Sequence, residues 1–324
     1  MNPDYVQTVR LLLAVVPEVF QGDHFALKGG TAMNLFLRDM PRLSVDLDLV
    51  VRDHTLTREE AFAMISGQMA RMQTALVKTG CVCEIGATRD GNDVKLFVQR
   101  GRHRVKVEVN HVFRGTVLPV ETRPLAPRAQ ALFQTGLEVP VLHTAELYGS
   151  KLVAAMDRQH PRDLFDVLSL YQEGGLTSEM IECFVCYLAG HNRPVHEVLS
   201  GNRLNIEPAF VNEFAGMADG TVALPELLEV RKQLFTEIPN RLTHEQRQFL
   251  LGLVHAEPNW SLMKQPHLSA MPAIAWKLAN LRRLKKSNPK KFQTQAEALE
   301  RVLEGSRMLG HSGLPTADKT LMKR

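Results

Sequence analysis

The 324-residue sequence is poor in cysteine and has no long apolar run. Its four cysteines, Cys81, Cys83, Cys183 and Cys186, fit a reducing compartment better than a disulfide-stapled secreted domain. No run approaches the roughly 20 apolar residues of a membrane-spanning helix, and the first residues lack the basic, apolar and small-residue progression of a signal peptide. These absences predict a cytoplasmic protein without a membrane segment.

Neither sign of charge is in large excess. The chain has 39 Lys and Arg against 35 Asp and Glu, a formal charge of +4, so any affinity for nucleic acid must come from local clusters. Gly-x-Ser-x-Gly, Walker, Gly-x-Gly-x-x-Gly and His-Glu-x-x-His motifs are missing from the sequence, which leaves hydrolase and dehydrogenase functions without support. The two cysteine pairs fall in a predicted strand and a predicted helix of different domains, which favours core packing over a zinc site.

Residues 25–51, FALKGGTAMNLFLRDMPRLSVDLDLVV, are the most informative stretch and indicate strand, glycine turn, helix, loop and strand. Gly29 and Gly30 allow backbone conformations that a side chain would forbid, and Thr31 is expected as the N-cap of the helix. The bare amides and the positive end of the helix dipole predict a phosphate site, with Lys28 and Thr31 as further donors.

Acidic residues follow this turn on a strand. The period of two puts Asp46 and Asp48 on one face, where the two carboxylates repel each other unless a cation such as Mg²⁺, shared with substrate phosphates, neutralises them. The strand around Val105–Asn110 offers Glu108 as a third carboxylate, although a solvated strand face explains it nearly as well. Each motif alone also fits an ordinary turn or strand end. Together they supply what nucleotidyl transfer requires, because metal ions must bridge the triphosphate and the attacking hydroxyl.

The pattern becomes helical after a junction near residue 140. Lys151 and Arg158 lie on one side of the first predicted helix, and Arg162, Asp163 and Asp166 lie at the start of the next. These residues gather around a helix–helix corner. A buried ion-pair network that joins two helices is the alternative interpretation of this cluster.

These motifs resemble those of the AbiEii/AbiGii-type nucleotidyltransferase toxins, a branch of the polymerase-β-like nucleotidyltransferase superfamily. The matching residues are Lys28-Gly29-Gly30-Thr31-Ala32, Arg42-x-Ser44-x-Asp46-x-Asp48, Lys151-Leu-x-Ala-x-x-x-Arg158 and Arg162-Asp163-x-x-Asp166. Gly30 stands where the superfamily usually has serine. The resemblance covers about residues 20–170 and implies an α+β fold, with a nucleotidyltransferase core of mixed sheet and flanking helices over 1–142 and a mainly helical domain over 143–324.

The resemblance also implies roles for individual residues. Two Mg²⁺ ions would be held by Asp46, Asp48 and Glu108. The catalytic set would be Asp46, Asp48, Glu108, Lys151 and Asp163. The NTP would be bound by Lys28, Gly29, Gly30, Thr31, Ser44, Lys151, Arg158, Arg162 and Asp166.

The function implied is that of a toxin in a bacterial toxin–antitoxin or phage-defence system, which transfers NMP from an NTP to an acceptor hydroxyl and inhibits growth. RNA, above all the tRNA 3′ end, is the expected acceptor, and a cognate antitoxin encoded nearby is the expected partner. Three alternatives stay open: a protein-modifying (NMPylating) enzyme, a small-molecule nucleotidyltransferase, and a non-enzymatic module that only binds nucleotide or RNA.

A basic run near the end of the chain is the candidate RNA contact. It consists of Lys277, Arg282, Arg283, Lys285, Lys286, Lys290 and Lys291, with Trp276 and Phe292 as nearby aromatics. Clustered Lys and Arg displace counterions from phosphates, which favours an RNA-binding surface. A solvated helix face is the alternative.

Overall fold

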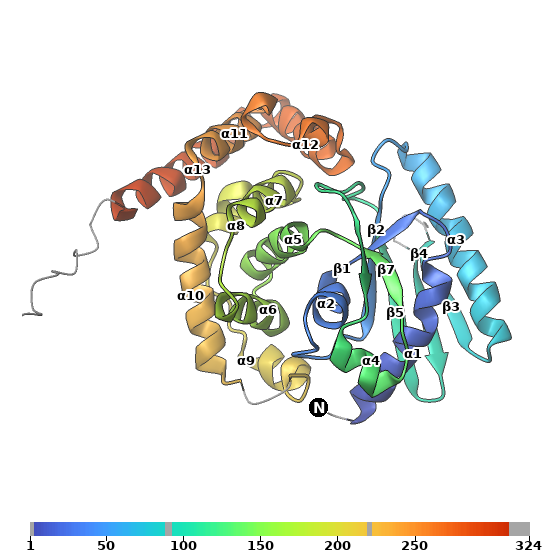
Figure 1. The fold of residues 1–324 in the computed structure, drawn as a ribbon. Helices are drawn as coiled ribbons and strands as arrows, with labels where there is room; N and C mark the ends of the chain where they lie inside the picture. The colour runs from blue at the N-terminus through green and yellow to red at the C-terminus, as the bar shows by residue number, and fades with distance from the viewer. Residues whose placement is uncertain (1–2, 88–92, 219–221, 311–324) are drawn as a thin grey trace, which may run out of the picture.

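The computed structural model describes residues 3–87, 93–218 and 222–310, which form a mixed sheet flanked by helices (Figure 1). The strands are β1 (Phe25–Lys28), β2 (Asp46–Val51), β3 (Val82–Ala87), β4 (Asp93–Arg100), β5 (His103–Asn110), β6 (Glu121–Pro124) and β7 (Glu138–Val141). Their order is β3-β4-β5-β2-β1-β7-β6. Strand β2 pairs parallel with β5 and antiparallel with β1, and β1 pairs parallel with β7. This mixed sheet confirms the predicted α+β fold.

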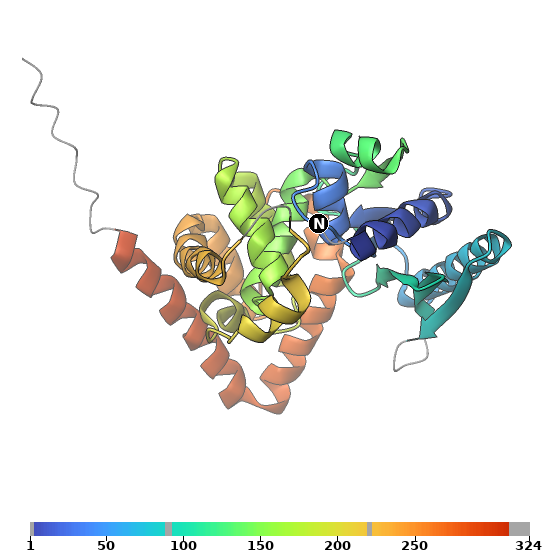
Figure 2. The ribbon, with the colours of Figure 1, turned by 90° about the horizontal axis from the view of Figure 1, so that it is seen from below.

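Helices flank the sheet and make up the C-terminal half. The N-terminal half contains α1 (Pro3–Val19), α2 (Gly29–Thr31), the π-helical η1 (Ala32–Leu37), α3 (Arg58–Lys78) and α4 (Pro127–Phe133). The C-terminal half contains α5 (Thr144–Asp157), α6 (Pro161–Gln172), α7 (Ser178–Ala189), α8 (Val195–Ser200), α9 (Glu207–Ala209), η2 (Phe210–Phe214), α10 (Leu224–Arg241), α11 (His244–Val254), η3 (Trp260–Leu262), η4 (Pro266–Ala270), α12 (Pro272–Ser287) and α13 (Pro289–Gly310). In Figure 2, α12 and α13 form the two arms of a V. Of the helices in the described ranges, none is both long and apolar enough to cross a bilayer.

Two faces of the sheet have different chemistry. On β5 the valines are buried and α1 packs against the strand, while Lys106, Glu108 and Asn110 on the opposite face are only half-buried. Helix α3 packs against β3 and β4. The polar face of the sheet is therefore left for the helical half to approach.

One continuous hydrophobic core runs through both halves of the chain, from Val9 in α1 to Leu303 in α13. The predicted division between residues 142 and 143 falls in the link between β7 and α5. The shared core joins the sheet to the helices, and the division of the chain into two domains stays a prediction.

One local expectation is wrong. The Thr31 side chain caps no helix, because α2 already begins at Gly29 and the Thr31 hydroxyl bonds instead to Ser44 and to the Asp46 carbonyl. Elsewhere, α4 begins with Pro127, whose fixed φ suits the first helical position, and α10 continues through Pro239, which is buried in the core.

Candidate active site

The acidic residues of the sheet lie side by side. In the parallel pairing of β2 with β5, Asp48 lies opposite Glu108 and Asp46 lies opposite Lys106. On the other side of β2, Lys28 of β1 lies opposite Asp48. The strand periodicity thus brings together the three carboxylates that the sequence predicted.

The glycine turn touches this acidic face. Gly29 has φ +72°, and a Cβ there would lie 2.3 Å from Asp48 Oδ2, so both the backbone conformation and the space require glycine. A Cβ at Gly30 would lie 2.8 Å from Arg42 Nη2 and 3.0 Å from Ser44 Oγ. The crowding around Arg42 explains why serine is absent at Gly30.

Thr31 and Ser44 face inward. The Thr31 hydroxyl is fully buried; it donates to the Asp46 carbonyl at 2.5 Å and lies within hydrogen-bond distance of Ser44 Oγ, at 3.0 Å. Ser44 is itself buried. Both side chains therefore fasten the start of β2 to the glycine turn, and the structure places neither hydroxyl at the open cleft.

The three carboxylates differ in their electrostatic environment. Burial raises the pKa of Asp46; Lys106 opposes this shift and the neighbouring Asp48 adds to it. Glu108 is ion-paired with Lys95 at 3.1 Å and Lys106 at 2.8 Å. Burial acts to raise the pKa of Glu108, but the hydrogen bonds from these two lysines outweigh it and lower the pKa. Asp46 and Asp48 are thus the acids without a lysine bound to them.

The acidic face offers two carboxylates to a metal ion. Among the described residues, no three His, Cys, Asp or Glu side chains converge closely enough to hold a metal by themselves. Asp46 and Asp48 nevertheless fit Mg²⁺, which commonly takes one or two carboxylates and completes its shell with water and substrate phosphates. Glu108 fits less well, because two ammonium groups already bind its carboxylate.

The residues of the later motifs form a buried ion network. Arg42 binds Asp166 through Nε at 2.8 Å and Nη2 at 2.7 Å. Lys151 Nζ lies 2.7 Å from Asp163 Oδ1 and 2.9 Å from Asp166 Oδ2, and Arg158 reaches Asp163 at 2.5 and 3.0 Å. The network links the loop before β2 to α5 and α6. Only Arg158, with 63% of its side chain exposed, reaches the surface.

The network joins three cations, Arg42, Lys151 and Arg158, to two carboxylates, so both acids are compensated. Burial acts to raise the pKa values of Asp163 and Asp166, but Lys151 and Arg158 hold that of Asp163 well below the ordinary Asp value, and Arg42 and Lys151 lower that of Asp166. Arg162 is not part of the network: it lies 3.8 Å from Glu213. Asp163 and Asp166 therefore contact cations of this chain and hold Lys151 in place.

A cleft of about 920 Å³ runs along the polar face of the sheet. It is lined by six predicted site residues: Lys28, Gly29, Asp48, Glu108, Lys151 and Arg158. Gly30, Thr31, Ser44, Asp46, Arg162, Asp163 and Asp166 do not line it. The structure thus divides the predicted set: six residues line the cleft, Thr31, Ser44 and the aspartates of the ion network are buried behind it, and Asp46 is half-buried on the same strand face as Asp48.

Sequence reasoning missed an aromatic wall in this cleft. Lys28 Nζ lies 5.7 Å over the ring of Tyr187, which stacks on Phe113 with centroids 4.0 Å apart at 7°. The Tyr187 hydroxyl donates to Glu146 at 2.9 Å, and Glu146, fully buried, also accepts from two backbone amides. Burial lowers the pKa of Lys28, while Asp48 and Glu146 act to raise it. No local motif marks these residues, which α5, α7 and the segment after β5 bring together.

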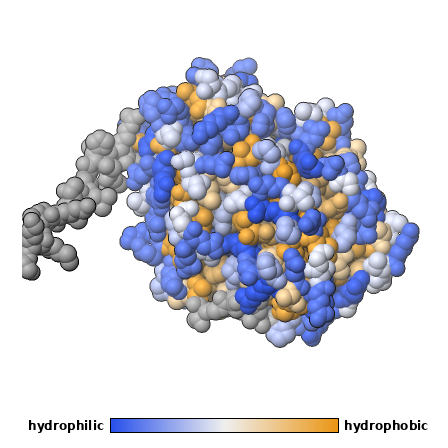
Figure 3. Space-filling view, in the orientation of Figure 1, coloured by the Kyte–Doolittle hydropathy of each residue, from blue (hydrophilic) through white to orange (hydrophobic). Residues whose placement is uncertain are grey.

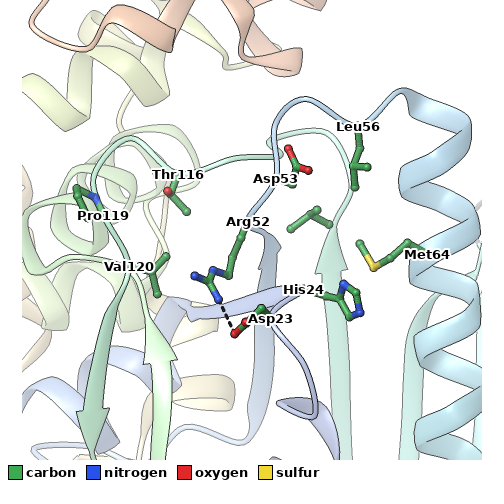
Figure 4. A pocket seen from close by; sticks show the side chains of 10 residues that line it. Asp23, His24, Arg52, Asp53, Leu56, Met64, Thr116, Pro119 and Val120 are labelled. Atoms are coloured by element: carbon green, nitrogen blue, oxygen red, sulfur yellow. Dashed lines mark hydrogen bonds and ion pairs between the residues drawn. The ribbon is translucent and has the colours of Figure 1, made fainter.

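A separate cavity of about 760 Å³ lies near the opposite end of β2 and is drawn in Figure 4. Arg52 there pairs with Asp23 at 3.1 Å, and none of the predicted site residues lines it. The chemistry of the motifs is therefore confined to the larger cleft.

The basic run lies on α12 and the first turn of α13, and one of its members is misassigned. Lys277 is only 5% exposed, because its ammonium donates to the His191 and Arg193 carbonyls. The nearby Phe292 is buried as well, in a cluster with Ala256 and Leu281. The remaining cations, Arg282, Arg283, Lys285, Lys286, Lys290 and Lys291, are exposed. Figure 3 shows hydrophilic residues over much of one face of the molecule, interrupted by scattered hydrophobic ones.

Comparisons with known proteins agree with this geometry. A family model described as "Nucleotidyl transferase AbiEii toxin, Type IV TA system" matches residues 10–280. The solved structure of MenT4, a nucleotidyltransferase toxin from Mycobacterium tuberculosis H37Rv, is similar in fold, with 20% identity, a TM-score of 0.55 and coverage of 84% of this chain and 93% of that chain.

Other comparisons add little. The CdnC:HORMA-deltaN complex of E. coli MS115-1 aligns with 11% identity over 93% of this chain and 88% of that chain, but its TM-score of 0.20 carries no argument about the fold. No curated protein matches the sequence. The family model spans most of the chain, including the glycine turn, the acidic strand and the ion network. The chain therefore belongs to the AbiEii family of nucleotidyltransferase toxins of type IV toxin–antitoxin systems, which implies an NTP substrate and a cognate antitoxin.

Proposed function

We propose that this toxin transfers an NMP unit to a hydroxyl of RNA, with the tRNA 3′ end as the first acceptor to test. One observation carries the proposal: the cleft brings Asp48 and the Gly29 turn together with Lys28, Lys151 and Arg158. Carboxylates for a metal ion and cations for a triphosphate thus share one site.

Asp46 and Asp48 are the proposed ligands of Mg²⁺, with Glu108 beside them as a third acid held by its lysines. When bound, Mg²⁺ would offset the charge of the triphosphate and favour ionisation of the acceptor hydroxyl. Gly29 and Gly30 present backbone amides to the outer phosphates, and Lys28 and Arg158 add positive charge.

In the proposed reaction the acceptor oxygen forms a bond to the α-phosphorus, the bond from the α-phosphorus to the bridging oxygen breaks, and pyrophosphate leaves with the electron pair. Asp48 or Glu108, adjacent on β2 and β5, accepts the acceptor's proton. Asp163 and Asp166 act as positioning residues, because their oxygens bind Lys151 and the arginines of this chain. Lys151 is thereby fixed beside the cleft.

The test is incubation of the protein with each α-³²P-NTP, Mg²⁺ and total RNA, followed by the same reaction with cell lysate. Label on RNA that depends on Asp48 supports the proposal. Label on protein or on a small molecule, with none on RNA, would assign the enzyme to one of the other two acceptor classes.

The exposed basic residues of α12 and α13 are the proposed RNA track. Charge reversal of Lys285, Lys286, Lys290 and Lys291 should weaken RNA binding and flatten its salt dependence, since each lost phosphate contact reduces the salt slope by about 1. NTP binding should not change. Reversal of Lys78 and Lys232, on the separate helices α3 and α10, is the matched control for reversal of Lys290 and Lys291 alone. Equal RNA affinity in both variants would argue against this face.

A further inference from the structure

We infer that Trp276 is the stacking platform for the base of the terminal acceptor nucleotide. This inference rests on the proposed function, because it assigns a subsite to the RNA acceptor. Trp276 lines the cleft and is 49% exposed, the largest of the exposed hydrophobic side chains among the described residues. An exposed tryptophan at the mouth of a catalytic cleft presents a flat face that any base can cover.

The cleft has an inner and an outer end. Gly29, Asp48 and the cations Lys28, Lys151 and Arg158 lie at the inner end, which suits the triphosphate. From there the wall passes through Tyr187 and Phe113. Figure 1 shows α12 close to the segment after β5.

Packing connects the wall to α12. A Cβ built on Gly190 would lie 3.0 Å from both the Phe113 ring and Ala273 Cβ, so these three residues are in close contact. Pro272 and Trp276, four residues apart and therefore on one side of α12, both line the cleft. Trp276 consequently forms the outer end of the same cavity.

Lys277 fixes the position of its neighbour. Its buried ammonium donates to the carbonyls of His191 at 2.8 Å and Arg193 at 2.5 Å. Burial lowers its pKa to about 8. These hydrogen bonds tie α12 to the segment that contains His191 and Arg193. His191 and Asn192 of this segment line the cleft as well. The Trp276 ring is thus carried by an anchored helix.

The surface beyond Trp276 indicates an RNA strand and not the NTP. Asn280 and Arg283 follow at four and seven residues, on the same side of α12, and Arg283 is exposed. A free nucleotide held by the inner cations has no phosphates left for Arg283, whereas an RNA chain continues past its terminal base. An aromatic platform followed by cations is the usual composition of single-strand binding surfaces.

Fluorescence tests the assignment directly, since the protein has only two tryptophans. The ring of Trp260 packs on Phe249 and does not line the cleft. In the Trp260→Phe variant, all tryptophan emission therefore comes from Trp276. A short single-stranded RNA with a free 3′-hydroxyl should quench this emission saturably, and Asp48→Ala should leave the quenching intact. Quenching by ATP, GTP, CTP or UTP but not by RNA, or no quenching by either, would overturn the inference.

Kinetics provide the second readout. Trp276→Ala should raise the KM for RNA about tenfold, from the loss of one stacked base, with little change in kcat or in the KM for NTP. Trp276→Phe should restore most of the loss, and a thermal melt should show both variants folded. RNA labelled by wild type with an unchanged KM in Trp276→Ala overturns this inference alone. Absence of RNA labelling by wild type, with label elsewhere, refutes the proposed function itself.

Discussion

The acidic face of β2 and the ion network of α5 and α6 each contain a pair of aspartates, but the two pairs differ in burial and in bound cations. Asp46 and Asp48 are half-buried, no lysine or arginine of the described ranges forms an ion pair with either, and burial raises the pKa of Asp46. Asp163 and Asp166 are 1% exposed and each is bound by two cations. The difference teaches that membership of a motif does not define a role: one pair is left to bind a ligand, and the other holds the wall behind it.

The largest effect should come from the acidic face. Asp48→Asn or Asp46→Asn should lower NMP transfer by about a thousandfold or more, because a carboxylate that neutralises the triphosphate region contributes several kcal/mol to the transition state. Growth inhibition should disappear with it. The melting temperature should stay the same or rise, since like-charge repulsion is removed.

Toxicity equal to wild type in both variants, with normal melts, would contradict the role of the acidic face. Asp53→Asn, at the far end of β2 in the separate cavity, is the matched control.

Substitution of an aspartate in the ion network should lower the stability of the protein. Asp166→Ala leaves Arg42 and Lys151 buried with one partner fewer, so the free energy of unfolding should fall by about 3–5 kcal/mol. Urea denaturation followed by circular dichroism measures this loss. A stable Asp166→Ala protein without activity would instead place Asp166 at the substrate.

Glu108 on β5 lies beside Asp48 but is held by lysines of the chain, as the aspartates of the ion network are. Because Lys95 and Lys106 already bind its carboxylate, Glu108→Gln should lower kcat by about tenfold, within the range of a general base and far less than Asp48→Asn. Steady-state transfer assays compare the two. A loss as severe as that of Asp48→Asn would restore Glu108 as a metal ligand.

The smallest expected effect is on the pH dependence of stability, to which Asp166 of the ion network and Asp46 of the acidic face contribute with opposite sign. The pKa of Asp166 is lowered in the fold, so its stabilisation is complete above the ordinary value of 3.8 and is lost as pH falls toward the lowered value. The pKa of Asp46 is raised in the fold, so as pH rises above 3.8 the unfolded chain loses this proton before the folded protein does. The contribution of Asp46 to the free energy of unfolding therefore falls as pH rises from 3.8 through the raised value.

Urea denaturation from pH 3 to pH 7 should therefore show a weaker acid-side loss of stability in Asp166→Asn and a stronger one in Asp46→Asn than in wild type. Identical slopes in the two variants would contradict the assignment.

Local sequence patterns predicted much of this structure. The helix predicted to begin near Arg162 is α6, and the alternation on β2 and β5 places Asp48 beside Glu108. These features depend on neighbours within a few residues, or on a period that the strand itself imposes. Local patterns could not show that Thr31 bonds across to Ser44, or that Lys277 is buried, since both depend on elements distant in the chain.

The sequence by itself indicated the family through its motifs, and it determined the acidic strand and the glycine turn, because spacing along a strand and through a tight turn follows from backbone geometry. Only the tertiary structure decided which charged residues face the cleft. Arg42 reaches Asp166 across 124 positions, and Trp276 lines the same cleft as Phe113 and Tyr187. Such pairings follow from the packing of helices onto the polar face of the sheet, and burial then decides whether a charge is held by a partner or left for a substrate.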